Sequence, residues 1–204
     1  MNQKERMLAG LPYKAWLDGL SEERLSNKIK IMEYNSIHPN DDEKRDKLIR
    51  RILGKTGPNV HLEAPFYCDY GYNIEVGDWF FSNYNCTILD VGKVIIGNNV
   101  MFAPNVSIYT AGHPIHPDSR NSGYEYGIPV TIKDNVWVGG NVVINPGVTI
   151  GNNVVIGSGS VVTKAIPDNM IAAGNPCKVI REITSEDRKY YFKDKEFDVI
   201  DYNE

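Results

Sequence analysis

The sequence is poor in cysteine and in net positive charge and has no long apolar run, and each shortage excludes a class of protein. Three cysteines, an odd number without a pairing pattern, argue against a disulfide framework and a zinc ribbon. The 204 residues carry a net charge of −4, whereas nucleic-acid-binding proteins normally present a basic field. No apolar run approaches the roughly 20 residues of a membrane span, and no apolar signal core follows residues 1–6. We therefore expect a cytoplasmic protein that binds neither nucleic acid nor membrane.

The chain changes character near residue 54, after which most of its 18 glycines and 11 prolines lie. Before that point, apolar residues recur at helical spacing, which predicts short helices that pack on whatever follows. The apolar positions of these helices are Leu20, Leu25, Ile29, Met32, Leu48, Ile49, Ile52 and Leu53.

From about residue 74 the apolar residues follow a period of six, which indicates a repeat architecture. This period fits no helix and is too short for a hairpin, but it accommodates one short strand and one turn. Three repeats then close a triangular coil of about 18 residues, whose inward aliphatic side chains stack into a continuous core. The glycines at Gly139, Gly151 and Gly157 each follow an inward position and predict turns of positive φ. The inward positions are Val76, Ser82 and Ile88, then Ile96, Phe102 and Ile108 after a slip of two residues, and finally Ile132, Val138, Ile144, Ile150, Ile156 and Val162.

A polar segment from Thr110 to Gly127 interrupts the repeat. Long irregular loops in compact folds are usually functional. His113 lies at the base of this loop, and a neutral imidazole can take a proton from a hydroxyl near neutral pH. We therefore predict His113 as a general base and His116 as a structural residue.

Metal and cysteine chemistry suit the segment less well. Two histidines are too few for the three-histidine zinc site of some β-helix hydratases, so we expect no bound metal. No histidine stands near Cys68, Cys86 or Cys177 in a pattern typical of a nucleophile, and all three suit core or turn positions.

Several segments together resemble the maltose and galactoside O-acetyltransferases. The resemblance covers about residues 4–182, and the histidine loop, the tryptophan-containing coil and the N-terminal segment are more specific than the hexapeptide period alone. The Asp-Tyr-Gly form at 69–71 resembles the maltose branch more closely. The segments are ERMLAG at 5–10, DYGYN at 69–73, YTAGHPIH at 109–116, NVWVGG at 135–140, VINPGVTIG at 143–151, GSVVTK at 159–164 and AGNPCKVI at 173–180.

The resemblance implies a mostly β protein, a left-handed parallel β-helix, assembled as a homotrimer with acetyl-CoA between neighbouring subunits. It divides the chain into an N-terminal helical cap at 1–56, a β-helix catalytic domain at 57–183 with the inserted loop 110–127, and a short C-terminal tail at 184–204. The implied reaction transfers an acetyl group from acetyl-CoA to a hydroxyl of a sugar such as maltose, glucose or a galactoside.

The resemblance also assigns roles to residues. It places His113 at the catalytic position, Asn83 near the transition state, and both Asp69 and Asn83 at sugar-binding positions. Glu125 is predicted to touch the acceptor or to orient His113. Contacts with CoA are expected from Trp137, Gly140, Ser158, Thr163, Lys164, Lys178 and Arg181, whose basic members suit anionic phosphates.

The tetrahedral oxyanion of acyl transfer needs hydrogen-bond donors already aimed at it. The backbone N–H groups of Gly139 and Gly140, beside Trp137, are candidates because no side chain obstructs them.

Two other functions stay open. A drug O-acetyltransferase acting on a streptogramin or chloramphenicol would share the coils, although such enzymes resemble this chain less in the N-terminal cap. A non-catalytic hexapeptide scaffold is the second alternative, and His113 in a long loop, with Lys164 and Arg181 still present, argues against it.

Overall fold

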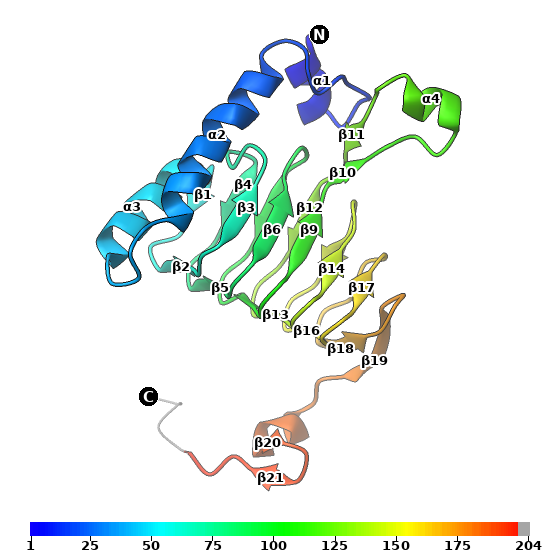
Figure 1. Cartoon of the computed structure of the whole chain (residues 1–204). Coiled ribbons are helices and arrows are strands. Elements are labelled where there is room, and N and C mark those ends of the chain that lie inside the picture. Colours follow the sequence, from blue (N-terminus) through cyan, green and yellow to red (C-terminus); the bar gives the residue numbers. More distant parts are fainter. Residues whose placement is uncertain (200–204) are drawn as a thin grey trace.

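A computed structural model describes residues 1–199 of the protein. Its strands wind into a stack of coils with three sides, and each coil contributes a strand to each side (Figure 1). Neighbouring strands within the three sides are parallel, except for the last strand of one side, and the N-terminal helices lie across the N-terminal end of the stack. None of the helices in the described part of the chain is long and apolar enough to cross a membrane.

The three sides are three sheets. The first sheet contains β1 (Lys55–Thr56), β4 (Ile74–Val76), β7 (Val94–Ile96), β12 (Val130–Ile132) and β15 (Thr149–Ile150). The second contains β2 (Val60–Leu62), β5 (Phe80–Ser82), β8 (Met101–Phe102), β13 (Trp137–Val138), β16 (Val155–Ile156), β18 (Met170–Ala173) and, antiparallel at its edge, β19 (Lys178–Glu182). The third contains β3 (Phe66–Cys68), β6 (Cys86–Leu89), β9 (Ser107–Tyr109), β14 (Val143–Ile144) and β17 (Val161–Val162).

The period of six is the spacing of the buried side chains. Ile132 pairs with Ile150, and Val138 pairs with Ile156, so each inward aliphatic stacks on its equivalent 18 residues later. The predicted stacked core is confirmed. Its six positions at 132, 138, 144, 150, 156 and 162 are each at most 1% exposed.

The polar loop has the same number of residues as one coil. Ile96 pairs with Ile132, a separation of 36 residues, which is twice the 18 residues between Ile132 and Ile150. The chain therefore leaves the stack after β9 and returns at β12 in register, adding no strand to the three sheets.

The corner turns differ from the prediction. Positive φ occurs three residues after the inward position, at Asn135 after Ile132 and at Asn153 after Ile150, and not at Gly139, Gly151 or Gly157. Asparagine tolerates this left-handed region because its short amide can bond locally. Glycine is needed at these positions for a different reason, which is close packing. A Cβ at Gly151 would lie 2.6 Å from the backbone nitrogen of Asp168 in the adjacent segment.

The N-terminal helices are α1 (Gln3–Leu8), α2 (Leu20–Asn35) and α3 (Asp42–Ile52). The predicted apolar face of α3 is buried. The prediction for α2 is wrong, because Leu25, Ile29 and Met32 are 57–68% exposed. The buried face of α2 carries polar groups that bond the coil beneath. Asn27 donates to the backbone carbonyl of Asp69 at 3.2 Å, and such a bond compensates the cost of burying an amide.

Beyond β19 the chain leaves the stack. The 3₁₀ helix η1 (Ser185–Lys189) and the hairpin of β20 (Tyr190–Phe192) and β21 (Lys195–Glu196) lie past the last coil (Figure 1). Arg181 ties this segment to β19 through two hydrogen bonds to the Asp187 carboxylate, at 2.7 and 2.8 Å.

Candidate active site

The loop at 110–127 is closed at its base. There β10 (Ala111–Gly112) pairs antiparallel with β11 (Tyr126–Gly127). Within the loop, the His116 ring caps the short helix α4 (Pro117–Asn121), because its Nδ1 accepts a hydrogen bond from the backbone N–H of Asp118 at 3.3 Å. His116 therefore shapes the loop.

His113 follows β10 directly and stands beside a carboxylate. Its side chain is 56% exposed, and its Nε2 lies 3.9 Å from Oε2 of Glu125. The other oxygen of Glu125, Oε1, accepts a hydrogen bond from the hydroxyl of Tyr13. The loop thus presents an accessible imidazole next to a carboxylate that is held in place.

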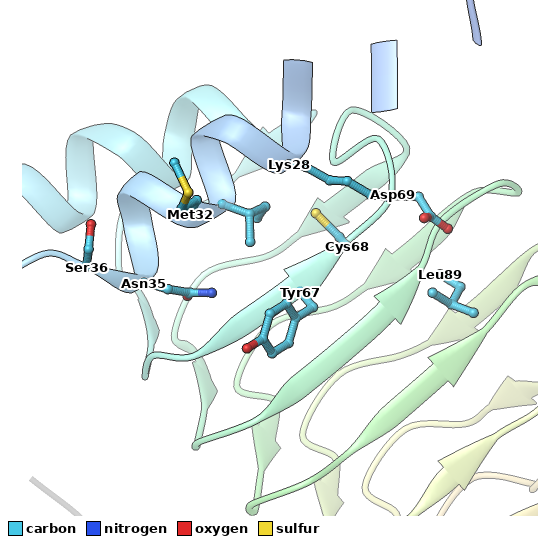
Figure 2. Close-up of a pocket in the computed structure, with 9 residues that line it drawn as sticks. Lys28, Met32, Asn35, Ser36, Tyr67, Cys68, Asp69 and Leu89 are labelled. Carbon is cyan, nitrogen blue, oxygen red and sulfur yellow. The ribbon is translucent and has the colours of Figure 1, made fainter. Parts of the chain in front are cut away.

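Asp69 borders a cavity of about 600 Å³ between α2 and the third sheet (Figure 2). Burial raises the pKa of the Asp69 carboxyl against the opposing charge of Arg24, and Glu125 adds to the rise. Besides Asp69, the cavity is lined by mainly apolar groups, among them Met32, Tyr67, Cys68 and Leu89, with Lys28 at its rim.

A second carboxylate, which the sequence did not single out, fixes the backbone of Asp69. Asp90 is fully buried, and its Oδ1 accepts hydrogen bonds from the backbone N–H groups of Asp69 and Tyr70, both at 2.9 Å. Its Oδ2 has no partner among the described residues. Burial raises the pKa of Asp90 to about 6, although the backbone hydrogen bonds work in the opposite direction.

This carboxylate makes stability depend on pH. The pKa of the Asp90 carboxyl is higher in the folded chain than in the unfolded chain. Its protonated form therefore stabilises the folded state at low pH, and this stabilisation is lost as pH rises through about 6. Asp90→Asn keeps an acceptor oxygen and cannot ionise. We expect the stability of this variant relative to the wild type to improve between pH 4 and pH 8 by up to about 3 kcal/mol. Urea unfolding of both proteins at matched concentration measures the difference, and an unchanged difference across this range would contradict the expectation.

Asn83 lies at a different corner, where the second sheet passes into the third. Its Oδ1 accepts a hydrogen bond from the backbone N–H of Tyr84 at 2.8 Å, so the amide NH₂ is the end that remains to donate. The prediction that Gly139, at this corner, donates to the oxyanion is wrong. Its N–H already donates to the Ile156 carbonyl at 2.8 Å, between neighbouring coils. The N–H of Gly140 faces Ser158 Oγ at 3.1 Å, a hydroxyl that can rotate away.

The predicted CoA contacts lie farther along the stack. Thr163 and Lys164 are exposed and follow β17, at the same corner as His113 but two coils beyond it. Lys178 is exposed on β19, and neither lysine is in an ion pair with another described residue. Arg181 is engaged by Asp187. Trp137 of β13 is 52% exposed on the outer face of the second sheet.

One chain thus holds two separate groups of predicted site residues. Asp69 and His113 lie where strands of the third sheet end, together with Glu125. Asn83 and Gly140 lie where strands of that sheet begin. No group of three or more His, Cys, Asp or Glu side chains within residues 1–199 is arranged to hold a metal ion.

Comparison with known proteins identifies the family. A family described as the maltose acetyltransferase hexapeptide capping motif matches residues 6–57, and the bacterial transferase hexapeptide family matches residues 129–164 with six repeats. The galactoside O-acetyltransferase of Escherichia coli K12 is 50% identical over 95% of this chain and 96% of its own.

Two solved structures agree with this match. A maltose O-acetyltransferase from Clostridium difficile 630 is 54% identical, with a TM-score of 0.89 over 90% of this chain and 98% of its own. A galactoside acetyltransferase in complex with coenzyme A is 48% identical, with a TM-score of 0.93 over 98% of this chain and all of its own. The predicted left-handed parallel β-helix is confirmed. The chain belongs to the maltose and galactoside O-acetyltransferase family of hexapeptide-repeat acyltransferases.

Proposed function

We propose that this protein transfers the acetyl group of acetyl-CoA to a hydroxyl of a sugar, with His113 as the general base. The observation that carries the proposal is the exposed His113 ring beside Glu125, at the corner where Asp69 borders a 600 Å³ cavity. The relatives named as maltose and galactoside O-acetyltransferases, one of them described with coenzyme A, support the substrate pair.

The reaction is a direct attack. The neutral His113 ring takes the proton of the sugar hydroxyl while its oxygen attacks the thioester carbonyl. The tetrahedral oxyanion accepts a hydrogen bond from the Asn83 amide NH₂. Its collapse breaks the carbon–sulfur bond, and the departing thiolate of CoA takes the proton from the imidazolium. We expect no acetyl-enzyme, because burial raises the pKa of Cys86 to about 12, that of Cys68 well above its usual range, and that of Cys177 as well.

The Asp69 carboxylate accepts hydrogen bonds from hydroxyls of the sugar, and the apolar wall of the cavity faces the rest of the acceptor. A screen with acetyl-CoA that follows release of free thiol tests the proposal. We expect release with maltose, glucose or a galactoside as acceptor. Release only with streptogramin or chloramphenicol, or none with any of the sugars, would refute it.

Because His113 lies where strands of the third sheet end and Asn83 lies where they begin, we infer that a complete site takes each from a different subunit of a homotrimer. Light scattering should therefore give the mass of three chains. Mixed trimers of His113→Ala and Asn83→Ala, two inactive variants, should regain part of the activity, because some interfaces combine the two intact residues. A single-chain mass, or no regain in mixed trimers, would contradict the shared site.

Lysines that carry no ion pair are expected to hold the phosphates of CoA. Lys164→Ala and Lys178→Ala should each raise the KM for acetyl-CoA about tenfold and leave the KM for the sugar unchanged, since charge-assisted contacts contribute roughly 1.5–3 kcal/mol. Arg181→Ala should have a smaller effect, because Arg181 already binds Asp187. Lys47→Ala on α3, where the amine pairs with Glu43, is the control. An unchanged KM for acetyl-CoA in both lysine variants would place the phosphates elsewhere.

A further inference from the structure

The segment after α1 holds the returning end of the histidine loop. The backbone N–H of Tyr13 donates to the Glu125 carbonyl at 2.9 Å, and the N–H of Glu125 donates to the Tyr13 carbonyl at 3.0 Å. Nearby, Gly123 has a φ of +82°, and a Cβ there would come within 2.2 Å of the Trp16 ring. The amine of Lys14 lies 5.1 Å from the centre of the Tyr124 ring. Residues 13–16 therefore fix the backbone of residues 123–125.

The side chain of Tyr13 adds a contact that the backbone does not need. Tyr13 is fully buried, and its hydroxyl donates to Oε1 of Glu125. Burial, and then the bond to Glu125, raises the pKa of Tyr13 far above its usual range, so the hydroxyl stays protonated and remains a donor. The donated hydrogen bond therefore fixes the Oε1 end of the Glu125 carboxylate.

The bonded carboxylate is the one that faces the base. With Oε1 held by Tyr13, Oε2 of Glu125 lies 3.9 Å from Nε2 of His113. A negative charge at this distance stabilises the imidazolium that forms when the ring takes a proton. That stabilisation costs no reorganisation if the carboxylate is already oriented before the reaction.

We propose that Tyr13 is a positioning residue for acetyl transfer: its hydroxyl orients the Glu125 carboxylate toward His113 and so makes the N-terminal segment part of the catalytic machinery. The inference rests on the proposed function, in which His113 is the base. A purely structural role would be served by the two backbone hydrogen bonds, and these survive replacement of Tyr13 by phenylalanine.

The test compares two variants, Tyr13→Phe and Tyr34→Phe, each of which removes one buried hydroxyl. Tyr34 of α2 is also fully buried, and its hydroxyl donates to the Leu62 carbonyl at 2.6 Å, away from the histidine loop. Tyr13→Phe should lower kcat roughly tenfold, less than the 100-fold that a misplacement of about 1 Å can cause, with KM for acetyl-CoA within about twofold of wild type. Tyr34→Phe should keep both constants, although it loses a comparable amount of stability.

A second measurement is independent of activity. The chain has four histidines, so a protein labelled at the histidine rings gives four ring signals by NMR, and His113→Ala identifies one of them. Tyr13→Phe should shift the His113 signal, and Tyr34→Phe should leave it in place. An unmoved signal together with equal kcat values in the two variants would overturn the role of Tyr13, while an active wild type would still support the proposed function. If the wild type acetylates no acceptor, the proposed function fails, and the NMR comparison alone decides whether Tyr13 orients the pair.

Discussion

Replacing His113 by alanine is expected to lower the turnover of acetyl transfer by at least about 100-fold, because a positioned general base contributes typically 10²–10⁴-fold. Acetyl-CoA should bind the variant almost as well as the wild type, since we expect the phosphates to contact other residues. Steady-state kinetics and a CoA titration on the same preparation separate the two effects. A variant that retained near-normal turnover would show that another group removes the proton.

His116→Ala is the matched control for this experiment. His116 lies in the same loop, but it bonds the backbone of Asp118 and caps α4, a helix of five residues. We expect a mild loss of turnover from the loosened loop. If His116→Ala were the inactive variant, the assignment of the base would be wrong.

Shortening one inward side chain of the coil stack should cost as much as a typical large core mutation. Ile96 of β7 is 2% exposed and stacks between Val76 and Ile132. Ile96→Ala is expected to lower the free energy of unfolding by about 2–5 kcal/mol, because the removed atoms leave a cavity that neighbouring coils cannot fill. Chemical denaturation at fixed protein concentration measures the loss.

The preceding residue provides the control. Ile95 has the same side chain, but it points outward and is 40% exposed. Ile95→Ala should cost less than about 1 kcal/mol, since surface substitutions usually have small effects. Equal losses at the two positions would mean that the outer face of the first sheet is as tightly packed as the interior of the stack.

The core could be predicted from the sequence because its contacts repeat. In a coil of fixed length, each residue contacts its equivalent one coil later. The regular spacing of residues such as Ile132 and Ile150 therefore predicts which side chains pack together. The loop was also visible, as an interruption of that spacing. His116 was predicted as a structural residue, but the helix that it caps appears only in the structure.

Other features could not be predicted because they depend on contacts that only the three-dimensional fold creates. Tyr13 meets Glu125 across 112 residues, and no local pattern joins the two. Leu25 has the spacing of a buried residue, yet α2 turns its polar Asn27 inward to reach the coil beneath. Arg181 has the charge expected of a phosphate ligand, but its binding to Asp187 of η1 appears only in the structure.

The loop that leaves the stack after β9 has a consequence for how such proteins can diversify. Its two ends are joined by β10 and β11, and the coils on either side meet across it as if it were absent. Its interior can therefore change in length and composition without altering the spacing of the core. The loop that carries the proposed base can therefore change in sequence while the coils keep their packing. A change confined to this loop can then alter the acceptor without altering the fold.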